Sequence, residues 1–403
     1  MSADESMRLA AIPPAGDRVR LLLVTAALLL ACFVPYYLLT LDLQWPIPRD
    51  GTTLVVGRDF LNFWMYGRAA WEADPAHYYD LAAYWRATEA VTGSPYPHQL
   101  WSYPPSVMLL AAPFAAFPYL PALALWTLVG LGCFAAALRL WTRQRRLLFP
   151  LLFAPAAVFG LMSGQFALIA AAAILAVLRW RESRPLLAGV LLGLLTVKPQ
   201  LGLFFPVMLL AARSWRVIAA AALTAAAVAG ATALFWGVGV WEAYLHSGLA
   251  NQSLVLTDPQ KLGGQFMPTI FMNARLLGAP FGAAMAVQAI AAIAAALLVW
   301  LVFSRRPPAG DLRANAIFLC ASVFGTPYLL SYDTLALGVL SALLFVRAGE
   351  GRLLPLLAYL LPLLQLVGLP GPALVPLLLA AQLFGTRRSS LPSPTSRNGA
   401  PPG

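Results

Sequence analysis

Asp59 is the first residue of this chain whose setting could support chemistry. It follows Arg58 directly and precedes the amide of Asn62, among aromatic side chains, in the first polar interval of a largely apolar sequence. A carboxylate can take the proton of an attacking hydroxyl when it lies within hydrogen-bonding reach and its neighbours tune its pKa. The adjacent guanidinium could support the ionised carboxylate or bind a phosphate. The alternative is a solvated loop acid, or the N-cap of a helix over residues 60–71, a position that Asp favours.

Lys198 is the second candidate, because it is a cation within a nearly continuous apolar stretch. Only two of the 27 basic residues are lysines, Lys198 and Lys261. A cation in such a stretch is costly unless it is paired or faces a cavity, so it marks a functional site by default. Near an acid it would suit an anionic phosphate, which lysine binds as a point charge. The alternative is that Lys198 only extends to the membrane–water interface.

Three further places carry polar side chains where apolar runs end. Gln165 offers an amide at a turn, with a plain turn as the alternative. Tyr328, Tyr332 and Asp333 form a polar cluster, in which Asp333 either binds substrate or caps the helix that follows. Arg275 lies where the chain returns to an apolar run, and it either meets a phosphate or extends to the interface.

The elements that must position these residues are transmembrane helices. Of the 403 residues, 60% are hydrophobic and only 11% are charged, whereas soluble domains carry roughly 25% charged residues. Many apolar runs approach the ~20 residues that a bilayer-spanning helix needs. The sequence therefore predicts an all-α polytopic membrane protein. The net charge of +11 comes from arginine clusters between apolar runs, the pattern of the positive-inside rule, so no nucleic-acid partner is expected.

The apolar runs predict about 12 transmembrane helices. The first covers residues 21–39, and the later ones lie approximately at 120–140, 147–162, 165–179, 185–197, 200–212, 215–236, 279–303, 313–330, 334–346, 353–368 and 371–385. We expect a cytoplasmic N-terminal segment over 1–19, one transmembrane catalytic domain over 20–385, and a disordered cytoplasmic tail over 386–403, which is rich in Ser, Pro and Arg.

The arginine clusters occur at every second gap between these runs. If all the arginine clusters lie on the cytoplasmic side, both termini are cytoplasmic and the loops 41–103 and 237–278 are outside. Asp59, which belongs to the first of these loops, and Lys198 then lie on the outer side. Aromatic residues recur at helical spacing in the first outer loop, which predicts amphipathic helices at the membrane interface. The run 106–117 is too short to span at 1.5 Å per residue, and it favours a re-entrant or tilted half-helix within segment 104–119.

The sequence contains no Walker loop, dinucleotide fingerprint, Cys/His metal pair or Ser-His-Asp order. A nucleotide substrate is therefore unsupported. If the site lies on the outer side, its substrate must be available there. Lipid-linked phosphates meet this condition, and cytosolic nucleotides do not.

The motifs resemble those of glycosyltransferase family 87, the polyprenol-phosphate-mannose-dependent mannosyltransferases of the GT-C type. The likeness extends over most of residues 20–345. The stretches that carry it are Arg58-Asp59-Phe60, Trp64, Gly67-Arg68-Ala69, Asp74-Pro75, Tyr79-Asp80, Tyr103-Pro104-Pro105, Pro113, Leu123-Ala124-Leu125-Trp126, Gly164-Gln165, Arg184-Pro185, Gly189, Gly193, Lys198-Pro199-Gln200, Pro268-Thr269, Arg275-Leu276-Leu277-Gly278, Tyr328 and Tyr332-Asp333.

This resemblance implies a GT-C fold and an enzyme that moves a hexose, with mannose expected, from a polyprenyl-phosphate carrier to an acceptor hydroxyl. The acceptor would be a glycolipid or glycan at the outer face of a bacterial cytoplasmic membrane. Asp59 would act as general base, with inversion at the anomeric carbon. Donor phosphate and substrate would be bound by Arg58, Lys198, Gln165, Arg275, Tyr332 and Asp333. Because a single Asp replaces an Asp-x-Asp pair, the sequence requires no divalent metal and no other cofactor.

Two other classes of protein compete with this interpretation. A transporter or flippase for a lipid-linked envelope precursor would predict symmetric halves and a polar site at the midplane. The sequence has no such internal symmetry, and its polar motifs gather at one face. A non-catalytic partner in envelope assembly is the third possibility, and the combination of an acid with several cations argues weakly against it.

Overall fold

The computed structural model describes residues 15–97, 99–257, 264–347, 351–367 and 371–386, and the structural statements below concern these residues. The predicted tail beyond residue 386, most of the predicted segment 1–19, and Lys261 in the second loop lie outside them. Within the described residues the chain is helical, and extended pairing is limited to isolated bridges between residues 42 and 55.

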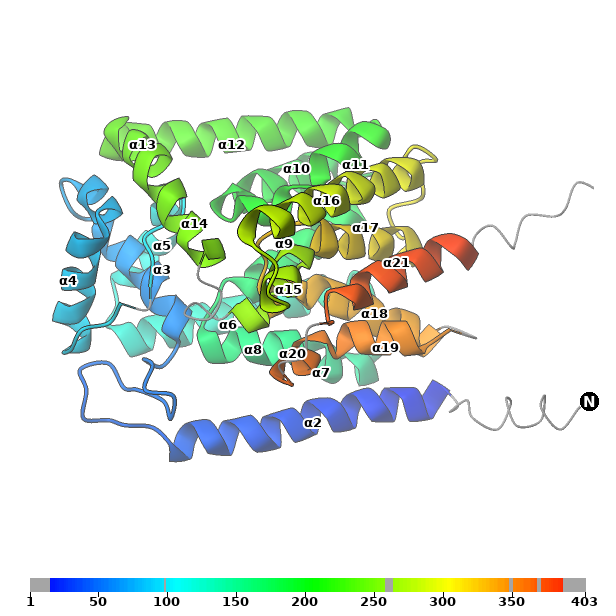
Figure 1. The fold of residues 1–403 in the computed structure, drawn as a ribbon, viewed down its shortest axis with the longest axis horizontal. Helices are drawn as coiled ribbons and strands as arrows, with labels where there is room; N and C mark the ends of the chain where they lie inside the picture. Colours follow the sequence, from blue (N-terminus) through cyan, green and yellow to red (C-terminus); the bar gives the residue numbers. More distant parts are fainter. Residues whose placement is uncertain (1–14, 98, 258–263, 348–350, 368–370, 387–403) are drawn as a thin grey trace, which may run out of the picture.

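Figure 1 shows the arrangement of these helices. In chain order they are α2 (Ala15–Leu39), α3 (Arg58–Ala69), α4 (Leu81–Thr92), α5 (Val107–Ala115), α6 (Tyr119–Leu138), α7 (Arg145–Leu152), α8 (Pro155–Ser163), α9 (Ala167–Trp180), α10 (Pro185–Leu194), α11 (Phe205–Ala211), α12 (Trp215–Trp236), α13 (Gly239–Ala243), α14 (Leu249–Thr257), α15 (Ile270–Leu276), α16 (Phe281–Phe303), α17 (Leu312–Gly325), α18 (Leu335–Arg347), α19 (Leu353–Tyr359), α20 (Leu361–Leu366) and α21 (Leu374–Thr386).

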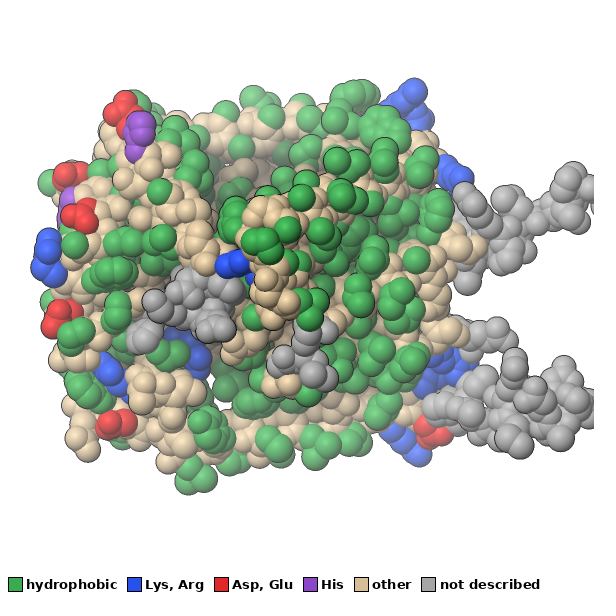
Figure 2. Space-filling view, viewed as in Figure 1, with side chains coloured by type: hydrophobic (Ala, Val, Ile, Leu, Met, Phe, Trp, Pro, Cys, Tyr) green, Lys and Arg blue, Asp and Glu red, His purple; other side chains and the backbone are tan. Residues whose placement is uncertain are grey.

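Four of the described helices are long and apolar enough to cross a membrane: α2, α6, α12 and α16. α7 and α8 meet at a bend of 47° and together make a fifth candidate. On the face shown in Figure 2, hydrophobic side chains cover a broad middle band and charged side chains are concentrated at the two ends. These features define a multi-pass membrane protein.

The predicted number of about 12 spans is not shown by the structure. Several apolar runs of the described chain form shorter helices, over Ala167–Trp180, Pro185–Val197, Pro199–Ala211, Leu312–Gly325 and Leu374–Gly385. At 1.5 Å per residue, a helix of 14 residues rises about 21 Å, less than the ~30 Å thickness of the hydrocarbon core. Prolines explain part of the difference, because they begin or interrupt helices where the sequence reads as a continuous apolar run.

Arginines hold several helix ends together at the end of the molecule where α2 begins in Figure 1. Arg18 donates a hydrogen bond to the carbonyl oxygen of Val346 at 2.6 Å, and Arg347 donates to that of Trp141 at 3.4 Å. Arg181 is buried and donates to Oδ1 of Asn315 at 3.1 Å. These contacts lie at the same end of the bundle, although the three arginines come from separate gaps between the apolar runs.

Helix α3 differs from the prediction of an interfacial helix, because it lies inside the protein. Its aromatic residues are buried, and the ring of Phe63 stacks on that of Phe166 with centroids 5.8 Å apart. Its glycine, Gly67, lies against α5 so closely that a Cβ there would come within 2.5 Å of the carbonyl oxygen of Ala111. The aromatic pattern of α3 therefore marks a core helix.

The short run after residue 104 forms α5. At 1.5 Å per residue this helix rises only about 14 Å, which is too little to span a bilayer.

Candidate active site

The first turn of α3 positions Asp59. The helix follows Gly57, whose φ of 67° is left-handed, and a Cβ on Gly57 would lie 2.7 Å from the side chain of Leu123. Glycine is therefore required there by both backbone and space. Asp59 is the second residue of the helix, and the N-cap position has no side-chain cap. The carboxylate does not cap α3; it accepts a hydrogen bond from Gln165 instead.

Gln165 joins Asp59 to a residue from a distant part of the chain. Its Nε2 donates to Oδ2 of Asp59 at 3.1 Å and to the hydroxyl oxygen of Tyr332 at 3.0 Å. Its Oε1 accepts from the backbone N–H of Phe166 at 2.9 Å, which fixes the orientation of the amide. The amide thus uses both of its N–H donors, and the hydroxyl proton of Tyr332 is left to donate elsewhere. Gln165 is more than a plain turn residue.

Replacing Gly164 should disturb this arrangement. Gly164 ends α8 with a φ of 66°, and a Cβ would lie 2.7 Å from that of Phe60 on α3. Gly164→Ala should destabilise the protein by about 1–3 kcal/mol, the usual cost of a strained left-handed residue, and should reduce activity because Gln165 moves. Thermal unfolding and activity measure both effects. Gly282→Ala is the control, since nothing lies within 4 Å of its added Cβ. Equal stability and activity in the two variants would contradict this role.

A cavity of about 120 Å³ opens beside Asp59. One water needs roughly 10–15 Å³ on this measure, so the space admits a group the size of several waters. The polar lining consists of one carboxylate, four carboxamides and four hydroxyls: Asp59, Asn62, Gln99, Gln165, Gln252, Ser102, Tyr103, Tyr328 and Tyr332. No basic side chain of the described residues lines it. The cavity is therefore suited to a neutral group that both donates and accepts hydrogen bonds.

The electrostatic setting of Asp59 favours proton uptake. Burial raises the pKa of the Asp59 carboxyl above its ordinary value of 3.8. Arg58 is the strongest opposing influence, and the Tyr332 hydroxyl and the Gln165 amide also favour the ionised form. A carboxylate with a raised pKa holds a proton more tightly than a solvated one, which improves it as a general base provided that it starts ionised.

Lys198 and Asp333 form a buried ion pair beside Tyr332. Nζ and Oδ1 are 2.5 Å apart, with the two side chains 2% and 0% exposed. The other carboxylate oxygen accepts from the N–H of Leu330 at 3.1 Å, and Nζ lies 5.1 Å from the centroid of the Tyr332 ring. The pair therefore holds the turn Ser331–Thr334, which carries Tyr332. Lys198 neither extends to an interface nor lines the cavity. Asp333 pairs with Lys198 and also caps the turn Ser331–Thr334, by accepting from the N–H of Leu330.

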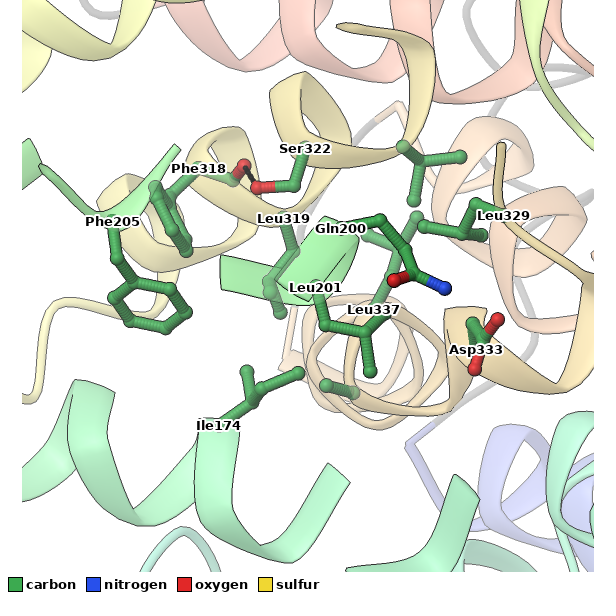
Figure 3. A pocket seen from close by; sticks show the side chains of 12 residues that line it. Ile174, Gln200, Leu201, Phe205, Phe318, Leu319, Ser322, Leu329, Asp333 and Leu337 are labelled. Atoms are coloured by element: carbon green, nitrogen blue, oxygen red, sulfur yellow. Dashed lines mark hydrogen bonds between the residues drawn. The ribbon is translucent and has the colours of Figure 1, made fainter. Parts of the chain in front are cut away.

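A second, smaller cavity of about 20 Å³ lies on another side of this ion pair. Figure 3 shows the amide of Gln200 turned toward Asp333, with the apolar side chains of Leu329 and Leu337 near them. The space admits about one water. It offers no room for a substrate, so the cavity at Asp59 is the candidate site.

The two predicted arginines do not line the cavity. Arg58 donates to Oδ2 of Asp50 at 2.8 Å with its side chain 28% exposed. Arg275 donates to the carbonyl oxygen of Ala279 at 2.9 Å, just beyond the end of α15. In both guanidinium groups Nε has no partner within the described part of the chain. The structure thus brings Asp59, Gln165 and Tyr332 together, places the Lys198–Asp333 pair beside them, and leaves Arg58 and Arg275 off the cavity wall.

Several lining residues were not predicted from the sequence. Gln99 and Ser102 come from the segment before α5, and Gln252 comes from α14 in the second loop. Asn62 is held by the Tyr84 hydroxyl, which donates to its Oδ1 at 2.9 Å. Single amides and hydroxyls in polar loops carry no spacing signal, so only the fold reveals that they meet. Among the described residues, no three His, Cys, Asp or Glu side chains gather as a metal-ligand group.

The fold and the cavity define a multi-pass membrane protein with a carboxylate-bearing polar site. Residues 101–331 match the model of glycosyltransferase family 87, and because this range covers more than half of the sequence, the chain belongs to that family. The protein is therefore a membrane glycosyltransferase. No curated protein and no solved structure matches the chain. The matched range contains Gln165 and Lys198 but begins after Asp59, so the role of Asp59 is argued from the geometry of the site.

Proposed function

We propose that the protein transfers a hexose, with mannose as the first candidate, from a polyprenyl-phosphate carrier to an acceptor hydroxyl, and that Asp59 is the general base. The observation that carries this proposal is the Asp59 carboxylate, which lines a polar cavity, is held by Gln165, and is the cavity's one charged group among the described residues. The likeness to the GT-C type supports an active site at the outer face of the membrane.

The reaction follows from these groups. The acceptor oxygen attacks the anomeric carbon while its proton passes to the Asp59 carboxylate, and the bond from that carbon to the carrier phosphate breaks with inversion. The phosphate leaves with the bonding electrons as a polyprenyl phosphate, and Asp59 returns its proton to solvent. A phosphate is a fair leaving group, so orientation of the acceptor and stabilisation of developing charge are the main tasks of the enzyme.

A lipid-linked donor is supported by the position of the site. The arginine clusters of Arg18, Arg181 and Arg347 lie together at one end of the helices, whereas α3 and α4 lie at the other end in Figure 1. If the arginine-rich end is cytoplasmic, as the positive-inside rule predicts, Asp59 faces the outer side. Nucleotide sugars are cytosolic, and lipid-linked sugars are available outside.

The donor phosphate fits Arg58 and Arg275 better than Lys198. Both arginines are partly exposed, and the Nε of each is unpartnered in the described residues. Lys198 is enclosed with Asp333 and would have to break that pair to reach a phosphate. We therefore assign Lys198, Asp333 and Tyr332 to positioning Asp59, and we assign the donor phosphate to Arg58 and Arg275.

The pH dependence of transfer should report the ionisation of Asp59. The base works when ionised, so activity should fall as the pH decreases through a pKa that burial has raised above 3.8. Tyr332→Phe removes a hydroxyl that favours the ionised form. The acid limb of kcat/KM should therefore move to higher pH in this variant. Tyr359→Phe is the control, because that buried hydroxyl bonds to Pro150 instead. An acid limb that stays in place or moves to lower pH would contradict the role of Tyr332.

Envelope chemistry tests the proposed function in cells. A strain that lacks the gene should lose a hexose from one class of envelope glycolipid or glycan, and the wild-type gene should restore it. An Asp59→Asn gene should fail to restore it even though the protein is present in the membrane. Unchanged glycans in the deletion strain, or full restoration by the variant, would overturn the proposal.

A further inference from the structure

We propose that Gln252 and Ser102 form a subsite that binds a hydroxyl group of a sugar ring in the Asp59 cavity, so that α14 takes part in substrate selection. The proposal rests on the proposed transferase function and deepens it by naming the group of the ligand that is bound and the residues that bind it. Gln252 comes from the second loop of the chain, and Ser102 comes from the segment that follows α4.

The first observation is an amide with an unused donor. The Nε2 atom of Gln252 is buried and has no hydrogen-bond partner among the described residues, although the side chain lines the cavity. Its Oε1 accepts from the hydroxyl of Ser102 at 3.0 Å, which fixes the amide with its N–H groups turned away from Ser102. A buried donor without a partner carries a free-energy penalty. A ligand that supplies an acceptor atom removes this penalty.

The second observation is that the neighbouring residue fixes the position of α14. Asn251 is buried, and its Nδ2 donates to the carbonyl oxygens of Tyr79 and Trp101, both at 3.1 Å. Trp101 directly precedes Ser102, and Asn251 directly precedes Gln252. The hydrogen bond from Asn251 to Trp101 therefore fixes Ser102 and Gln252 relative to each other. An amide that is held in place before the ligand arrives loses little conformational entropy on binding.

The chemistry of the wall favours a sugar hydroxyl over a phosphate. No basic side chain of the described residues lines the cavity, and Asp59 would repel an anion there. A hydroxyl can accept from Nε2 of Gln252 and can also donate. The hydroxyl of Tyr328 lies beside the Gln252 amide and lines the same cavity. A neutral ring that carries several hydroxyls matches a wall of carboxamides and hydroxyls.

The ring could belong to the donor or to the acceptor, and monodeoxy sugars distinguish the two sources. We would reconstitute the full-length protein in lipid nanodiscs. Its donors would be polyprenyl-phosphate mannose, glucose and galactose together with their monodeoxy forms, and its acceptors would be the matching methyl pyranosides. Binding of the same methyl pyranosides would be followed separately by saturation-transfer NMR, which does not depend on turnover.

The wild-type protein should lose about tenfold in kcat/KM when one particular hydroxyl is absent, the value of one hydrogen bond. Gln252→Leu should lose about tenfold with the complete sugar and should no longer respond to that deoxy position. Ser102→Ala should show a smaller loss of the same kind, because it only releases the amide. Gln44→Leu, the same change at an exposed residue of the first loop, should behave as wild type. A response confined to donor forms assigns the subsite to the donor sugar, and one confined to acceptor forms assigns it to the acceptor.

If Gln252→Leu responds to every monodeoxy form as wild type does, in both transfer and binding, the subsite is wrong while the transferase function stands. If the wild-type protein transfers no sugar from any lipid carrier but binds methyl pyranosides in a manner that depends on Gln252, the transferase function is wrong while the subsite stands.

Discussion

Asp59→Asn should lower the rate of sugar transfer by about 10²–10⁴-fold, the usual contribution of a general base, while the protein stays folded. Asparagine keeps the shape of the side chain and an oxygen that can accept from Nε2 of Gln165. It cannot take the proton of the acceptor hydroxyl. The loss should therefore appear in the rate of the chemical step and not in the amount of protein or in its binding of the donor.

The stability of this variant provides an independent check. Burial raises the pKa of Asp59 in the folded protein, so protonation of this group favours folding. Its contribution is present at low pH and is lost as the pH rises through the raised pKa. Asparagine imitates the neutral form. Asp59→Asn should consequently have a Tm at neutral pH that equals or exceeds that of the wild type.

Asp80→Asn is the matched control in the same interval. Asp80 is exposed and caps α4 through the N–H of Ala82, and asparagine caps a helix about as well as aspartate. This variant should keep full activity. If Asp59→Asn and Asp80→Asn transfer sugar at the same rate, Asp59 is not the general base.

The second large effect concerns the buried ion pair. Lys198→Ala leaves the Asp333 carboxylate unpaired at 0% exposure, and breaking a buried pair in this way costs about 3–5 kcal/mol. The turn that carries Tyr332 should loosen, and both stability and activity should fall. Unfolding of the purified protein in detergent, followed by tryptophan fluorescence, measures the first effect.

A double variant separates stability from substrate contact. Lys198→Met with Asp333→Asn removes both charges together, and the asparagine can still accept from the N–H of Leu330. It should recover most of the lost stability, because neutral replacement of a buried pair is often tolerated. If Lys198 acts only by positioning, activity recovers as well. A double variant that is stable but has a strongly raised KM for the donor would show that Lys198 binds the phosphate.

Much of the site could be predicted from residue types. Asp59, Gln165 and Tyr332 are polar residues at the ends of apolar runs, and the alternation of arginine clusters predicts that they lie on one side of the membrane. Their convergence on one cavity agrees with that reasoning. Lys198 stands out in the sequence as a cation within an apolar stretch, but the sequence does not identify its partner, because pairing with Asp333 depends on how distant helices pack.

The fold was less predictable in two respects. Runs such as 165–179 and 185–197 have the hydropathy of spans, yet α9 and α10 are shorter than a bilayer because helix length is set by prolines and turns. The aromatic residues of α3 have the spacing of an interfacial helix, but the helix is covered by α5 and by the segment before α9. The same apolar and aromatic residue types cover helices that face lipid and helices that are buried in protein. Residue composition therefore does not distinguish the two environments.

The most direct test of the account is transfer from a defined donor by the purified protein in liposomes. Radiolabelled polyprenyl-phosphate mannose, glucose and galactose would be compared with the corresponding nucleotide sugars, with a membrane extract of the deletion strain as acceptor. We predict that label passes to the acceptor from at least one polyprenyl-phosphate sugar, that none passes from the nucleotide sugars, and that Asp59→Asn lowers the rate of transfer by about 10²–10⁴-fold. Transfer from a nucleotide sugar alone, or transfer by Asp59→Asn at the wild-type rate, would contradict the account.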